Sequence, residues 1–155
     1  MNEVEEKFGQ IYFAVLGAIA LVFGVAELIA SAGEGFTWGI LDSSGAADPM
    51  FLPWRAIILI SVGFFYLSSV RNFAEIHQLA KAVMASIMIW IVAGMAIWSR
   101  IAGSIPGEET WFNSLEGFLA SYAPPYCPEM FLLPFSLVIV YYIMKEKEAR
   151  MTGQK

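Results

Sequence analysis

Glu27 is the residue of this sequence whose position first suggests chemistry, because it falls inside a long apolar run. Arg55 begins the next run and Arg100 follows the third. A carboxylate at such a position is costly unless it is paired or hydrated. We expect a structural ion pair of Glu27 with Arg55 or Arg100. Two alternatives are a carboxylate that binds a proton or a cation, and a side chain that reaches the surface and has no role.

Other reactive residue types are too few to build a familiar site. Cys127 is the only cysteine, so a disulfide or a Cys-x-x-Cys redox pair within one chain is excluded. His77 is the only histidine, which excludes a bis-histidine haem and a multi-histidine metal site in one subunit. No phosphate-binding P-loop is present. We therefore predict no catalytic residue, no cofactor and no metal.

Four apolar runs must position these residues, and they cover about 9–31, 51–70, 79–99 and 128–144. Each is close to the roughly 20 residues that a helix needs to cross a bilayer. Hydrophobic residues make up 58 % of the 155 and the mean hydropathy is +0.63, which a single small soluble core cannot bury. The sequence predicts an all-α integral membrane four-helix bundle, with residues 1–155 as a single domain in the lipid bilayer.

The distribution of basic residues predicts the orientation, since positively charged loops stay on the cytoplasmic side. Arg55 and Arg100 are the only two of the nine basic residues on the opposite side of the predicted spans. The other seven are Lys7, Arg71, Lys81, Lys145, Lys147, Arg150 and Lys155. We predict a multi-pass protein of the cell membrane with both termini cytoplasmic. The net charge of −5 argues against nucleic acid as a partner.

The second outward loop contains a further predicted element, a short amphipathic helix over residues 108–122 that lies in the membrane interface. Its apolar positions recur at helical spacing and form a candidate docking face: Trp111, Phe112, Leu115, Phe118, Leu119 and Tyr122. Two roles are open for this helix. It is a lid over the bundle, or it is a surface on which a partner subunit or a lipid docks.

Small residues in the first and third runs predict where helices approach closely, because packing in lipid depends on short side chains. Gly17 and Gly24 lie in the first run, and Ser86 and Gly94 lie in the third. We expect these two helices to form the main contact of the bundle.

Three classes of function fit this composition. We expect an accessory or assembly subunit of a larger membrane complex, without chemistry of its own, whose partners are other membrane subunits or further copies of the chain. The alternative is an oligomeric transporter or channel that uses Glu27 at the outer membrane level. In hydropathy the chain also resembles the small four-span proteins of the DoxX type, some of which are associated with quinone-linked oxidation. A second alternative is a quinone-linked or lipid-linked membrane enzyme of this topology, which would need titratable groups near one interface. Glu27, Arg55, Arg100 and Tyr126 are the candidates.

Overall fold

The computed structural model describes residues 3–32, 51–72, 75–103 and 128–153, and these are almost entirely helical, with no strand among them. The elements are α1 (Glu3–Ala32), α2 (Phe51–Ser69), the 3₁₀ turn η2 (Val70–Asn72), α3 (Ile76–Gly103), α5 (Pro128–Ser136) and α6 (Val138–Met151). Three stretches are long and apolar enough to cross a membrane: Glu3–Ile29, Ile76–Trp98 and Pro128–Ala149. The helix over Pro53–Ser69 is apolar but shorter. The chain is therefore treated as a membrane protein.

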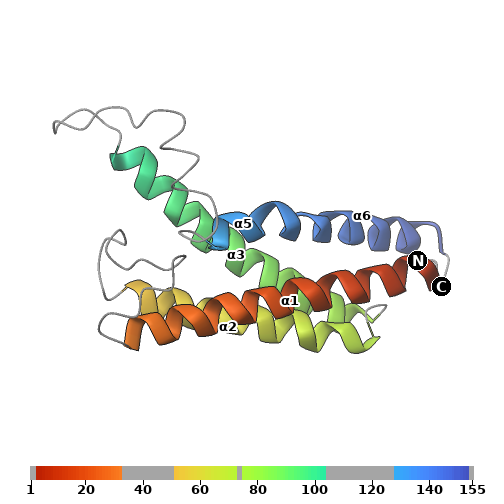
Figure 1. Ribbon diagram of the computed structural model, residues 1–155. Coiled ribbons are helices and arrows are strands. Elements are labelled where there is room, and N and C mark those ends of the chain that lie inside the picture. Colours follow the sequence, from red (N-terminus) through yellow and green to blue (C-terminus); the bar gives the residue numbers. More distant parts are fainter. Residues whose placement is uncertain (1–2, 33–50, 73–74, 104–127, 154–155) are drawn as a thin grey trace.

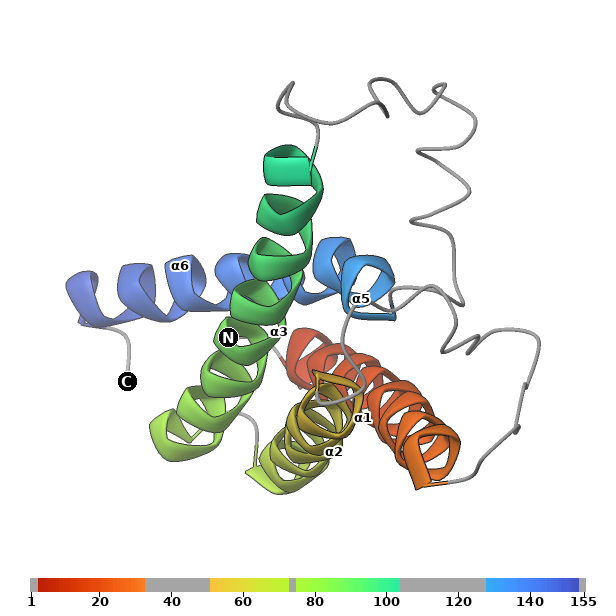
Figure 2. The same ribbon diagram turned by 90° about the vertical axis from the view of Figure 1, so that its left-hand side faces the viewer.

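The helices pack against one another at different inclinations (Figures 1 and 2). α1 and α2 lie side by side and antiparallel, α3 crosses them, and α5 and α6 cover another side (Figures 1 and 2). The start of α1 contacts α6 in the middle of the last helix, where the Tyr142 hydroxyl donates to the Glu5 carbonyl oxygen at 3.1 Å. The Lys145 ammonium also pairs with the Glu5 carboxylate. These contacts hold the first and last helices together.

Glycines allow α1 and α2 to pack with their backbones in near contact. A Cβ added at Gly24 would lie 2.7 Å from the Ile60 nitrogen, and one added at Gly63 would lie 2.5 Å from Leu21 Cγ. A Cβ at Gly17 would lie 3.1 Å from the Gly63 carbonyl oxygen. No larger residue fits at these positions without a shift of the helices, as expected for small-residue packing in membranes.

The partner of the first helix differs from the one expected from small residues. The glycines of α1 pack on α2, and α3 makes its main contacts with α2 and α5. Ser86 does lie in the core, where its Oγ is 2.7 Å from the Tyr66 hydroxyl of α2. Gly94 is exposed, and no described atom lies within 4 Å of the position that a Cβ would occupy. Helix α1 packs on α2 because Gly63 of α2 lets the two backbones approach each other closely.

The last span is interrupted, although its apolar run is continuous. Pro134 lies inside α5 and lacks a backbone donor, and the helix is broken at Leu137 before α6 begins. Ser136 at this break accepts a hydrogen bond from the Trp90 indole nitrogen at 2.7 Å. Its own hydroxyl donates to the Leu133 carbonyl oxygen at 2.6 Å. The break is thus held against α3 by a buried polar side chain.

Candidate functional site

A cluster of three charged side chains is buried between α1, α2 and α5. Glu27, Arg55 and Glu129 are only 0 %, 7 % and 1 % exposed. Arg55 Nη2 lies 2.7 Å from Glu27 Oε1, and Arg55 Nε lies 3.1 Å from Glu27 Oε2. Arg55 Nη1 lies 3.4 Å from Glu129 Oε1. One guanidinium therefore connects two carboxylates that come from opposite ends of the sequence.

Each member of the cluster is placed by its helix. Glu27 lies in the last turns of α1, Arg55 in the first turns of α2, and Glu129 directly after the proline that begins α5. Because α1 and α2 are antiparallel, the end of the first and the start of the second lie at the same level. Helix α5 brings its first turn to that level from the far end of the chain.

The geometry lets one arginine contact both acidic side chains. A guanidinium is always charged in proteins and presents a planar fork of donors that matches a carboxylate. Here the fork contacts both oxygens of Glu27, and a third nitrogen points toward Glu129. Charge-assisted contacts of this kind are the strong ones, but they mainly offset the cost of removing the charges from water. The arrangement can fix three helices relative to one another.

The structure describes only some of the candidate site residues that were predicted from the sequence. The structure brings Glu27 and Arg55 together, and Arg55 is one of the two partners that we expected for Glu27. Arg100 lies in α3, but its side chain is not among those described. The predicted helix over 108–122, with its docking face, lies outside the described residues, as does Tyr126.

Sequence reasoning missed Glu129. We expected Glu27 to pair with Arg55 or Arg100 and did not include Glu129 among the candidate residues. The structure instead buries Glu129 against Arg55. A signal was available, because Glu129 begins the fourth run at the same predicted level as Arg55 at the start of the second. Because a guanidinium has more N–H donors than one carboxylate can accept, Arg55 could have been predicted to contact Glu129 as well.

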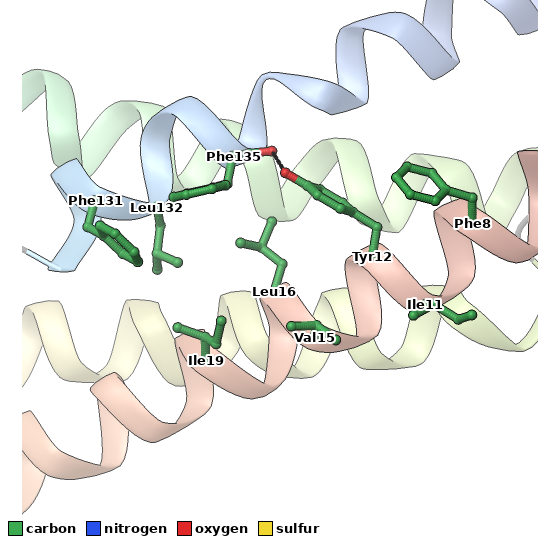
Figure 3. A pocket seen from close by; sticks show the side chains of 9 residues that line it. All are labelled: Phe8, Ile11, Tyr12, Val15, Leu16, Ile19, Phe131, Leu132 and Phe135. Atoms are coloured by element: carbon green, nitrogen blue, oxygen red, sulfur yellow. Dashed lines mark hydrogen bonds between the residues drawn. The ribbon is translucent and has the colours of Figure 1, made fainter.

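A second feature is an apolar groove between α1 and α5, with a volume of about 350 Å³. Figure 3 shows the side chains that line it, with the α1 residues on one wall and the α5 residues on the other. They are Phe8, Ile11, Tyr12, Val15, Leu16, Ile19, Phe131, Leu132 and Phe135. The Tyr12 hydroxyl donates to the Phe135 carbonyl oxygen at 2.9 Å, at a point along the groove between Phe8 and Ile19 (Figure 3).

The described residues include no group of three or more His, Cys, Asp or Glu side chains that could hold a metal ion. No protein-family model matches the chain, and no curated protein or solved structure matches it.

Proposed function

We propose that this chain is a four-span protein of the cell membrane that serves as an accessory or assembly subunit of a larger membrane complex and performs no chemistry of its own. The observation that carries the proposal is the charged cluster. Arg55 contacts both oxygens of Glu27 and also contacts Glu129, so the buried charges are engaged with one another. A transport site needs polar groups that face a hydrated path, whereas these three side chains are buried and contact one another.

The proposed topology places α2 as a fourth span and both termini in the cytoplasm. Support for it comes from the contacts of Glu5 with Tyr142 and Lys145, which put the first and last helices at one end. The η2 turn between the second and third helices lies at the same end (Figure 1). An even number of crossings is consistent with that arrangement, and the seven basic residues on this side favour the cytoplasm.

A subunit of this kind needs a surface for its partner, and we propose the carboxyl-terminal half of α3. This half diverges from α1 and α2 (Figure 1). Ile91, Met95 and Trp98 are exposed there, Trp98 to 70 %. Gly94 lies among them, and no described residue comes within 4 Å of the position of its missing Cβ, which would let the backbone of another helix approach closely. The occupant that we propose is a transmembrane helix of a different subunit.

The test is co-purification of the tagged full-length chain in mild detergent, followed by native mass measurement. A defined complex that contains another membrane protein is expected from the wild-type chain. Gly94→Leu should reduce recovery of that partner at least fivefold. The substitution meets no described atom in the monomer and removes a glycine from a helix interior, so the stability of the monomer should not fall.

Val22→Phe is the matched control, because Val22 is an exposed apolar residue of α1 and not of the proposed docking helix α3. Recovery of the partner should be unchanged in this variant. A wild-type chain that purifies only as a monomer, and that conducts ions when reconstituted in liposomes, would contradict the proposal and favour transport through Glu27.

A further inference from the structure

The groove between α1 and α5 has the length of one bilayer leaflet. Its α1 wall runs from Phe8 to Ile19, which at about 1.5 Å per residue corresponds to about 16 Å. Half of a typical hydrocarbon core of about 30 Å is about 15 Å. The acidic first turn of α1, with Glu5 and Glu6, lies just before Phe8 and marks the polar boundary. The groove thus extends from that boundary to about the middle of the membrane.

The groove offers a ligand apolar surface almost exclusively. Its walls are aliphatic and aromatic side chains, and the one side-chain polar group among them is the Tyr12 hydroxyl. That hydroxyl already donates to the Phe135 carbonyl oxygen. A ligand with a polar ring or headgroup would find no donor along these walls to replace its hydrogen bonds with water. A plain hydrocarbon chain needs none.

The volume also fits such a chain. If a methylene group occupies the ~30 Å³ that a water molecule takes in the liquid, a volume of about 350 Å³ holds about a dozen methylene groups. An unfilled groove would deprive its lining of dispersion contacts, and close packing is a main source of stability between surfaces in lipid. Hydrocarbon is also the medium that surrounds both walls, because α1 and the α5–α6 stretch each have the length and composition of a membrane span.

We propose that this groove is a specific site for one acyl chain of a membrane phospholipid from the leaflet on the side of the chain termini. The chain lies along α1 from Phe8 toward Ile19, against Phe131 and Phe135 of α5 (Figure 3). This lipid completes the packing between the first and last spans, next to the Tyr12 hydrogen bond. The inference requires a membrane-spanning chain and does not depend on the proposed partner subunit.

The experiment uses the full-length chain reconstituted in phosphatidylcholine vesicles that contain a small fraction of phosphatidylcholine with a photoreactive diazirine in its acyl chain. After illumination, mass spectrometry of peptides maps the labelled residues. We expect label concentrated on residues 8–19 and 131–135. Val15→Trp should reduce it at least fivefold, because Val15 lines the groove and is exposed enough to accept a larger side chain there.

Val22→Trp is the control for this measurement, since Val22 is similarly exposed on α1 but does not line the groove. Its labelling should match that of the wild-type chain. Label spread evenly over the exposed apolar faces, or left unchanged by Val15→Trp, would overturn the proposal. So would a protein–protein cross-link at these residues, which would show that a second copy occupies the groove, or a prenylated quinone that co-purifies in place of phospholipid.

The two proposals fail in different ways. If the groove proposal is right, Val15→Trp removes the lipid label and leaves recovery of the partner subunit unchanged. Gly94→Leu should have the opposite effect in the same two assays. Loss of the label in both variants would contradict a site confined to α1 and α5.

Discussion

Replacing Arg55 by methionine would remove the shared positive charge of the buried cluster while keeping a long side chain in place. The substitution eliminates the contacts of 2.7 and 3.1 Å to Glu27 and the contact of 3.4 Å to Glu129. Both carboxylates, at 0 % and 1 % exposure, would lose this cation. The change therefore measures what the cluster contributes to holding α1, α2 and α5 together.

The expected loss can be set against known buried ion pairs. Removing one partner of such a pair costs about 3–5 kcal/mol, because the remaining charge stays buried. We expect the free energy of unfolding to fall by that amount in Arg55→Met. Arg55→Lys keeps the charge but loses the planar fork that contacts three carboxylate oxygens, so a smaller loss of about 1–2 kcal/mol is expected.

Unfolding by SDS in mild detergent micelles, followed by far-ultraviolet circular dichroism, gives the required free energies. The control is the triple substitution Glu27→Gln, Arg55→Met and Glu129→Gln, which removes all three charges together. Such replacements are often neutral, so most of the stability lost in Arg55→Met should return. If Arg55→Met unfolds within about 0.5 kcal/mol of the wild-type chain, well below the range typical of buried pairs, the cluster is not a structural tie.

Three further predictions concern the helix contacts and the topology. Gly63→Ala should lower the free energy of unfolding by about 1–3 kcal/mol in the same assay, since its Cβ would lie 2.5 Å from Leu21 Cγ. Gly94→Ala should leave that free energy unchanged. Equal losses of stability in the two variants would contradict the packing described. Tyr66→Phe should lower the free energy of unfolding by about 1 kcal/mol, because it removes the buried hydrogen bond between Tyr66 and Ser86. The Ser86 hydroxyl still donates to the Ala82 carbonyl oxygen in this variant. An unchanged stability would show that the Tyr66–Ser86 bond adds nothing. Epitope tags at the two ends should react with antibody only after cells are permeabilised, and a tag that reacts on intact cells would refute the proposed orientation.

Helix content and the approximate helix positions could be predicted from hydropathy, but the helix ends could not. The run predicted over 9–31 corresponds to α1, which starts at Glu3, because acidic residues are favourable in a first turn. Likewise α3 reaches from Ile76 to Gly103, beyond both ends of the run over 79–99. Hydropathy marks the apolar part of a helix and not the polar turns that continue it.

Helix pairing and the full charged cluster depend on non-local geometry that one sequence does not display. Small residues in the first and third runs suggested a contact, but Gly63 of the second helix provides the closer fit for Gly17. Glu27 and Arg55 belong to neighbouring helices, so their shared level could be predicted from the antiparallel hairpin. Glu129 comes from more than 70 residues further along the chain, and its place beside Arg55 depends on how α5 returns to the bundle.

The most direct test of the central claim is to purify the charge-free triple variant and measure both partner capture and ion flux. If the charged cluster only holds the helices together and the protein acts in assembly, the folded triple variant will recover the same partner subunit as the wild-type chain. Neither protein will conduct ions in liposomes above the level of empty vesicles. Ion flux in the wild-type chain that disappears in a folded triple variant would contradict the claim and make the cluster part of a transport site.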